Sequence, residues 1–209
     1  SYDGFITSFK VLYKDKEMGD IVLALPGIHN VVNALAACGV AIELDIPFWK
    51  VREALEGFGG IHRRLEMKWN GAIKLIDDYG HHPTEIKATL AAVRQMWKGR
   101  IVVVFQPHRY TRTKALMEEF ATSFNEADVL IVTEIYAASE EKIEGVDGQG
   151  LSETIRASGH KNVMFAASKE DAAEVVLGMA REGDVVITLG AGDICRIEER
   201  LKAAWSGQG

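Results

Sequence analysis

The pattern of hydrophobic and polar positions changes character partway along the chain. From about residue 65 onward, short apolar runs alternate with longer segments of helical periodicity. The runs at 101–105 and 129–133 are continuously apolar, which is typical of parallel strands covered on both faces. Strands are predicted at 74–78, 101–105, 129–133, 163–165 and 185–189. This alternation predicts an α/β domain with a doubly wound, mostly parallel sheet.

Helices are predicted between these strands, because apolar residues recur there at helical spacing. The predicted segments are 83–97, 113–125, 168–180 and 194–204. Ser168 followed by Asp171 resembles a capping box and indicates where the third helix begins. In folds of this class, ligands bind beyond the carboxyl ends of the strands, so the chemistry is expected at that edge of the sheet.

The amino-terminal part of the chain has a different pattern. Residues 6–13 and 21–25 are predicted to form a β-hairpin, with its turn at Met18-Gly19-Asp20. A helix is predicted at 31–44. Pro47 then opens a second helix at its first position, and a glycine-rich segment ends it.

Composition narrows the possible classes of protein. The chain has 209 residues, 47% of them hydrophobic and 26% charged, with a net charge of −6. This acidic balance argues against nucleic acid as a partner, and no apolar run approaches the ~18 residues that a membrane span needs. No signal peptide opens the sequence, and the isolated Cys38 and Cys195 fit a reducing compartment, so a cytoplasmic location is expected.

Unusual polar residues follow the ends of the predicted strands. Asp77-Asp78-Tyr79-Gly80-His81-His82 spans the end of the first strand, and Gln106-Pro107-His108-Arg109 follows the second. Asp78 can also be a polar loop residue placed near a helix start, where negative charge is favourable. A metal site is not expected, because the adjacent side chains of His81 and His82 point in different directions.

Arg109 and Arg112 are three residues apart at a predicted helix start, so both guanidinium groups can face one ligand. Planar bidentate geometry would suit a carboxylate or a phosphate. The alternative is a solvated surface with ion pairs to Glu118 or Glu119. Gly190-Ala191-Gly192, after the last strand, is interpreted first as a tight turn and second as a ligand loop.

Two further segments carry candidate binding residues. Asn30 and Asn33 share a face at the start of a predicted helix. Either can cap that helix, and together their amides can also suit the edge of an adenine. Arg63 and Arg64 lie where the pattern changes, and they are either plain surface residues or part of a site at a domain boundary.

The stretches GIHNVVNALAA, GIHRRLE, DDYGHHPTEI, FQPHRYTRT and LGAGDI resemble the Mur ligase family in order and spacing, and in particular its L-alanine-adding member. The resemblance covers the chain from about residue 5 to about residue 200. The family member that recycles murein tripeptide is the alternative. The resemblance implies that residues 1–62 are the last part of a central ATP-binding domain. Residues 63–209 would then be a Rossmann-like carboxy-terminal domain that binds the amino acid.

The resemblance also implies an activity and two groups of site residues. The activity is that of an ATP- and Mg-dependent carbon–nitrogen ligase of peptidoglycan synthesis, which joins L-alanine to UDP-N-acetylmuramate through an acyl phosphate. The nucleotide would be bound by Asn30, Asn33, Arg64 and Asp78. The amino-acid carboxylate and the muramoyl end would be bound by Tyr79, His81, Arg109 and Arg112. Arg64, Asp78 and His81 would have catalytic roles.

One feature of the family pattern is missing. No G-x-x-x-x-G-K-[ST] loop occurs in these residues, so the main phosphate and metal ligands for ATP are absent. We therefore expect a fragment that is inactive alone, with exposed apolar faces that could favour a homodimer. A nucleotide-dependent oxidoreductase would need a glycine fingerprint after an early strand, and that fingerprint is absent. A non-catalytic interaction module is also disfavoured, because it has no reason to gather arginines and histidines at one sheet edge.

Overall fold

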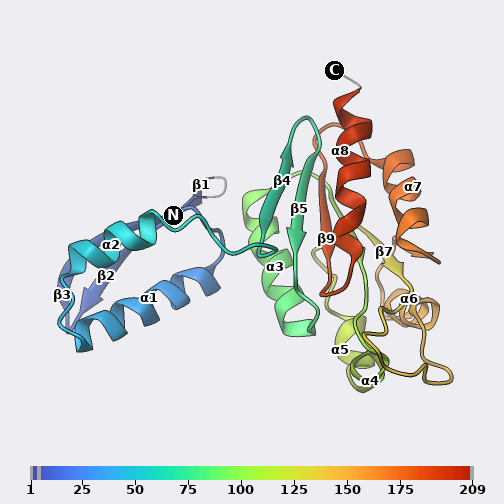
Figure 1. Cartoon of the computed structure of the whole chain (residues 1–209), viewed down its shortest axis with the longest axis horizontal. Coiled ribbons are helices and arrows are strands. Elements are labelled where there is room, and N and C mark those ends of the chain that lie inside the picture. The colour runs from blue at the N-terminus through green and yellow to red at the C-terminus, as the bar shows by residue number, and fades with distance from the viewer. Residues whose placement is uncertain (1, 4–5, 208–209) are drawn as a thin grey trace.

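The computed structural model describes residues 2–3 and 6–207, and these residues form two units. Figure 1 shows the small unit, in blue and cyan, joined to a larger α/β unit by an irregular segment after its second helix. The elements of the small unit are β1 (Tyr2–Asp3), β2 (Ile6–Tyr13), β3 (Lys16–Leu23), α1 (Ile28–Glu43) and α2 (Phe48–Glu56). Its strands form an antiparallel sheet in the order β1-β2-β3, and α1 and α2 pack against that sheet.

The large unit contains a sheet with the strand order β4-β5-β9-β6-β7-β8, in which only β4 is antiparallel to its neighbour. Its elements are β4 (Glu66–Asn70), β5 (Lys74–Asp78), α3 (Pro83–Met96), β6 (Ile101–Phe105), α4 (Tyr110–Ala115), α5 (Met117–Ala121), β7 (Val129–Thr133), α6 (Gly148–Ala157), β8 (Val163–Ala166), α7 (Lys169–Met179), β9 (Val185–Leu189), the 3₁₀ turn η1 (Ile194–Ile197) and α8 (Glu198–Ser206). Because β9 returns between β5 and β6, the loops after these three strands meet at one carboxyl edge.

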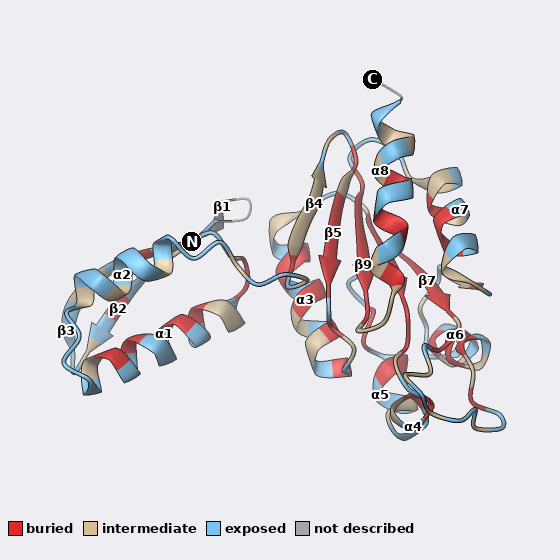
Figure 2. Cartoon of the chain, in the orientation of Figure 1, coloured by how far each residue is buried: buried red, intermediate tan, exposed pale blue. Residues whose placement is uncertain are grey.

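Each parallel strand contributes side chains to two cores, one on each face of the sheet. Val103 and Phe105 of β6 lie in the core that α3, α5 and α6 cover. Val102 and Val104 lie in the core that α7 and α8 cover. Every residue of β6, β7 and β9 is buried, as Figure 2 shows in red. The continuous apolar runs in the sequence therefore correspond to strands that are covered on both sides.

The predicted fold class and the predicted strands of the large unit are confirmed, with four of the five strands at the predicted bounds. The hairpin of the small unit is also confirmed, but its predicted turn is wrong. The turn lies at Lys14 and Asp15, whose φ angles are 49° and 62°, and Met18-Gly19-Asp20 lies inside β3. The glycine at position 19 is explained by packing, because a Cβ there would lie 3.0 Å from the ring of Phe48.

The helix predicted at 113–125 is wrong in its extent. It begins at Tyr110 and is divided into α4 and α5 at Leu116, whose φ of −117° interrupts the helix. The half-buried edge strand β4 and the helix α6 were not predicted. In the part of the chain that the structure describes, no helix combines the length and the apolar character required to span a bilayer.

Candidate functional site

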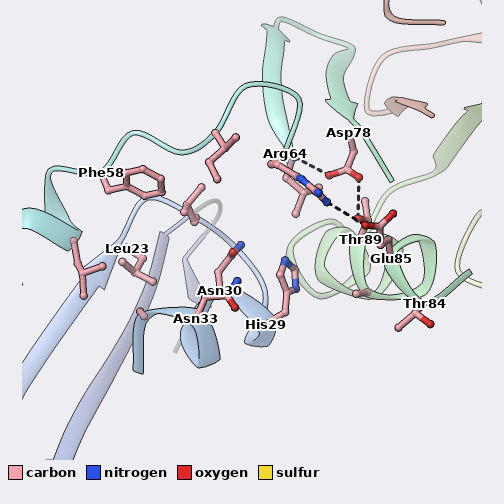
Figure 3. Close-up of a pocket in the computed structure, with 16 residues that line it drawn as sticks. Leu23, His29, Asn30, Asn33, Phe58, Arg64, Asp78, Thr84, Glu85 and Thr89 are labelled. Carbon is pink, nitrogen blue, oxygen red and sulfur yellow. Dashed lines mark hydrogen bonds and ion pairs between the residues drawn. The ribbon is translucent and has the colours of Figure 1, made fainter. Parts of the chain in front are cut away.

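A cleft of about 600 Å³ lies between the small unit and the large unit. Figure 3 shows His29, Asn30 and Asn33 of α1 on one side, facing Arg64, Asp78 and Glu85 on the other. Apolar side chains line the part of the cleft next to β3 and α2, and they are Leu23, Leu25, Leu55, Phe58 and Ile61. The cleft therefore offers an apolar end and a polar end to one ligand.

The start of α1 places its polar residues at this cleft. The N-cap of the helix is Gly27, with a φ of 96°, and a Cβ there would lie 2.7 Å from the ring of His29 and 3.0 Å from Ala92 Cβ on α3. No side chain among the described residues caps α1, so capping does not explain the two asparagines. Asn30 Nδ2 donates to Pro26 O at 2.7 Å, and Asn33 is exposed in the cleft.

Asp78 forms part of the cleft wall and is held firmly by its neighbours. Its Oδ2 accepts a hydrogen bond from Leu65 N at 2.9 Å, and its Oδ1 accepts hydrogen bonds from Gly80 N at 2.8 Å and Thr89 Oγ1 at 3.2 Å. Burial raises the pKa of Asp78 above its ordinary value, despite these donors. Both carboxylate oxygens are therefore engaged in shaping the wall.

Arg64 is the half-exposed cation of the cleft. Its Nη1 lies 3.6 Å from Glu85 Oε1, and its guanidinium lies 5.9 Å from the centre of the Tyr79 ring. Glu85 also accepts hydrogen bonds from the amides of His81 and His82, at 3.0 and 3.2 Å, as part of the capping box of α3. Although burial opposes it, these bonds and nearby positive charges keep the pKa of Glu85 below its usual value.

A row of four rings lies along the carboxyl edge of the sheet, beside the cleft. The ring centres are 5.5 Å apart for Tyr79 and His81, 5.9 Å for His81 and His108, and 5.6 Å for the stacked pair His108 and Tyr136. Backbone bonds hold the second loop against the third, from Arg109 N to Tyr136 O at 2.9 Å and from Tyr136 N to Pro107 O at 2.8 Å. The loops after β5, β6 and β7 therefore build one surface.

Arg109 and Arg112 lie at this edge, but among the described residues their guanidinium groups have different partners. Arg112 Nη1 donates to His108 O at 3.0 Å and lies 3.2 Å from His108 Nδ1. Arg109 is half-exposed, with its Nη1 3.9 Å from Glu140 Oε1. Burial, followed by the charge of Arg112, lowers the pKa of His108 and favours its neutral form. The geometry expected for residues three apart in a helix is absent, because Arg109 is the N-cap of α4, with a φ of 76°.

The loop after β9 is a tight turn against the loop after β6. A Cβ on Gly190 would lie 2.7 Å from Gln106 O, and one on Gly192 would lie 2.7 Å from Tyr136 Cγ. Gln106 Nε2 donates to Asp193 Oδ1 at 2.9 Å, and Asp193 also pairs with Lys169. These contacts account for both glycines without a ligand.

Within residues 2–3 and 6–207, one group of side chains has the spacing of metal ligands. The ligand atoms of Asp77, Cys195 and Glu198 lie within 4.8 Å of one another. However, Arg63 Nε donates to Asp77 Oδ2 at 2.8 Å, so a guanidinium already supplies the positive charge there. The group is separate from the cleft, and we interpret it as a buried ionic network.

The four residues that the sequence analysis assigned to the nucleotide, Asn30, Asn33, Arg64 and Asp78, all line the cleft. Other residues of the same cleft were missed, and they are His29, Phe58, Thr84, Glu85 and Thr89. A signal for His29 was present, because it precedes Asn33 by one helical turn and so lies on the same face of α1. The contribution of Phe58 depends on how the segment after α2 folds back, which no local pattern encodes.

A family model described as "Mur ligase, glutamate ligase domain" matches residues 63–192. The UDP-N-acetylmuramate–L-alanine ligase of Geotalea daltonii is 50% identical over 201 residues, which are 96% of this chain and 44% of that protein. The corresponding ligase of Myxococcus xanthus is 49% identical, with 95% of this chain and 42% of that protein covered. The chain thus spans less than half the length of these curated relatives.

Solved structures show the same similarity. The crystal structure of UDP-N-acetylmuramate–alanine ligase from Thermotoga maritima has a TM-score of 0.76 and 31% identity, covering 91% of this chain and 40% of that one. The murein peptide ligase of Psychrobacter arcticus has a TM-score of 0.65 and 26% identity, covering 98% of this chain and 42% of that one.

Proposed function

The chain belongs to the Mur ligase family, and we propose that it forms the carboxy-terminal part of an ATP-dependent ligase that joins L-alanine to UDP-N-acetylmuramate. The observation that carries the proposal is the cleft between the two units, which gathers Asn30, Asn33, Arg64 and Asp78 from distant parts of the sequence. Residues 1–62 would complete an ATP-binding domain, and residues 63–209 would form the domain that binds the amino acid.

The recycling ligase for murein tripeptide is the second candidate. Its representative from Psychrobacter arcticus shares 26% identity with the chain, against 31% for the alanine ligase from Thermotoga maritima and about 50% for the curated alanine ligases. This difference favours L-alanine as the amine that the full-length enzyme joins.

The shape and charge of the cleft suit a nucleotide that is held by both units. The apolar end beside Leu55 and Phe58 would take the base, with Asn30 and Asn33 at its polar edge. Arg64 would face the phosphates, because it is half-exposed in the same cleft and its charge is only partly offset by Glu85 at 3.6 Å. Mg²⁺ would neutralise phosphate charge, but we assign it no ligand in this chain, since both oxygens of Asp78 are engaged.

The row of rings would form the site of bond formation. In the proposed reaction, the γ-phosphoryl group of ATP passes to a muramoyl carboxylate oxygen and ADP leaves. The amine nitrogen of L-alanine then attacks the carbonyl carbon, phosphate departs, and the nitrogen loses a proton. Tyr79 and His81 would border this reaction, and Arg112 beside His108 would bind the alanine carboxylate. Closing the two units around the acyl phosphate would exclude water, which otherwise hydrolyses it.

The proposal predicts that Arg112→Ala, made in the full-length ligase that contains this chain, raises KM for L-alanine. We expect a loss in kcat/KM for L-alanine of about 10-fold or more, which corresponds to roughly 1.4 kcal/mol of transition-state binding, with KM for ATP unchanged. Phosphate release measured at varied L-alanine and varied ATP separates the two effects. The matched control is Lys114→Ala, which removes an exposed cation from the same short helix and should leave both KM values unchanged.

Activity of the full-length enzyme with murein tripeptide, and none with L-alanine, would overturn the choice of substrate. Unchanged L-alanine dependence in Arg112→Ala would overturn the assigned role of this arginine. The chain alone is expected to show no ligase turnover, because no G-x-x-x-x-G-K-[ST] phosphate-binding loop occurs within its residues.

A further inference from the structure

Arg63 ties the segment that enters the large unit to two loops at the carboxyl edge of its sheet. The side chain is 14% exposed, and Arg63 Nε donates to Asp77 Oδ2 at 2.8 Å. Its Nη2 donates to Gly190 O at 2.6 Å, and its Nη1 donates to Gly192 O at 3.2 Å. One guanidinium therefore bridges the end of β5 and the turn after β9, using the fixed fork of donors that only arginine has.

The backbone on both sides of Arg63 is tied to the same edge. Arg63 N donates to Glu66 Oε2 at 2.9 Å, and Tyr79 N donates to Arg63 O at 2.7 Å. Two residues on, Leu65 N donates to Asp78 Oδ2 at 2.9 Å. Arg63 and Leu65 both have positive φ values, of 59° and 47°. These bonds therefore stabilise a backbone conformation that residues other than glycine rarely adopt. We call residues 63–65, with these contacts, the entry clasp.

Two residues of the candidate site are attached to the clasp. Arg64 lies inside it and lines the cleft, whereas Arg63 does not line the cleft. Tyr79 hydrogen-bonds to it through its amide, and its ring lies 5.0 Å from the Arg63 guanidinium. The glycines of the connecting segment, Gly57, Gly59 and Gly60, all precede the clasp, and Gly60 has a φ of 93°. A change in the angle between the units would therefore be absorbed before Arg63, and Arg64 would move with the large unit.

We propose that Arg63 is a positioning residue, which sets the direction of Arg64 toward the cleft and of Tyr79 toward the row of rings without touching either ligand itself. The clasp is defined by contacts of the chain, and only the identity of what Arg64 and Tyr79 bind rests on the proposed function. The two parts of the inference can therefore fail separately.

The chain supplies a matched control at the opposite end of the same sheet. Arg100 donates through Nε to Asp184 Oδ1 at 3.0 Å and through Nη2 to Asp184 Oδ2 at 2.6 Å and Met179 O at 2.7 Å. Its backbone O accepts a hydrogen bond from Val185 N at 2.9 Å, as Arg63 O does from Tyr79 N. Arg100 is thus a similarly buried arginine bonded to a buried aspartate, but it lies away from the cleft.

The first test compares Arg63→Lys with Arg100→Lys by amide hydrogen exchange on this chain. Lysine keeps the positive charge but presents its donors from a single nitrogen, so it cannot reproduce the three hydrogen bonds that Arg63 makes from three nitrogens. A variant that still folds therefore loses only these contacts of the clasp. We expect exchange at Tyr79 and Leu65 to become about 10-fold faster or more in Arg63→Lys, with Val185 unchanged, and the reverse in Arg100→Lys. Equal protection of Tyr79 in both variants would overturn the clasp.

The second test measures how Arg63 acts in the full-length ligase that contains this chain. If Arg63 acts through Arg64, Arg63→Lys should raise KM for ATP about 10-fold, and Arg63→Lys combined with Arg64→Lys should be little worse than Arg64→Lys alone. Arg100→Lys should leave KM for ATP and KM for L-alanine unchanged. Fully additive losses in the double variant would overturn the positioning role. A full-length protein without any ligase activity, combined with the expected exchange pattern, would refute the proposed function and leave the clasp intact.

Discussion

The two units bury their hydrophobic residues to very different degrees. In the large unit, the two cores on either side of the sheet enclose side chains such as Leu90, Phe105 and Ile131, all with no exposed surface. In the small unit, one cluster contains Val11, Ile21, Leu23, Ala34 and Cys38, and none of the residues of α2 is buried. Large apolar side chains there stay exposed, among them Val32 at 58%, Val40 at 61% and Leu44 at 65%.

This difference shows that a segment can form a regular helix without burying most of its apolar side chains in a core. The helix α1 forms over its whole length, but a two-layer unit of this size covers only one face of it. The sheet of the large unit has helices on both faces, so the same kinds of residue are removed from water completely. The exposed apolar side chains of α1, which include Val32, Leu35 and Val40, are candidates for an interface.

The largest effect that we expect from this contrast is at Leu90. Leu90→Ala removes a fully buried side chain of α3, which packs in the core with Ile86 and Phe105, and should destabilise the large unit by about 2–5 kcal/mol. Urea unfolding, followed by a probe in the large unit, measures the change. A loss smaller than about 1 kcal/mol would mean that the core relaxes around the cavity, which would weaken the contrast between the units.

The second effect depends on pH and is specific to the large unit. Glu198 is 4% exposed at the start of α8, and Thr188 Oγ1 lies 3.3 Å from its Oε1 while donating to Asp77 Oδ1 at 2.8 Å. Burial, followed by the charge of Asp77, raises the pKa of Glu198 to about 7, although Lys68 opposes the shift. The folded state therefore binds a proton that the unfolded state releases between about pH 4.5 and 7.

The sign follows from this raised pKa. The charged form of Glu198 is disfavoured in the folded state, so the stability of the large unit should rise as the pH falls from about 7 to about 5, by at most roughly 3 kcal/mol from this group. Glu198→Gln should flatten that part of the curve of unfolding free energy against pH. The small unit should not gain stability as the pH falls over this range, because burial lowers the pKa of its His29, so the folded state binds this proton less readily than the unfolded state does. Unchanged pH dependence in Glu198→Gln would show that another group titrates there.

The same contrast explains how much of the fold the sequence predicts. Strands such as Ile101–Phe105 can be predicted because burial on both faces requires a continuous apolar run, and the structure has the predicted bounds. The strand Glu66–Asn70 was not predicted, because it alternates charged with apolar residues and, at the edge of the sheet, none of its residues is fully buried. The burial of Glu198 is equally hard to predict from the sequence. A glutamate in the first turn of a helix is ordinarily solvated and interacts favourably with the helix dipole.

For the candidate site, the sequence predicts which residues lie near one another better than it predicts which of them are in contact. Residues at the ends of parallel strands meet at one edge by topology alone, which explains why Asp78, His81 and Arg112 were placed together from the sequence. Which partner a long side chain takes depends on the local backbone. The positive φ at Arg109 turns it toward Glu140, and the positive φ at Arg63 aims it at Asp77, and neither angle is encoded in a periodic pattern.

The smallest expected effect is at Leu35, the counterpart of Leu90 on the exposed face of α1. Leu35 is 41% exposed, so Leu35→Ala removes little contact within the chain and replaces one good helix former with another. We expect the unfolding free energy to change by less than about 0.5 kcal/mol, measured in the same urea series as Leu90→Ala. If copies of the chain dimerise through α1, the loss would be larger and would grow with protein concentration. Sedimentation of both variants at two concentrations therefore decides whether the open face of the small unit is bare or covered in solution.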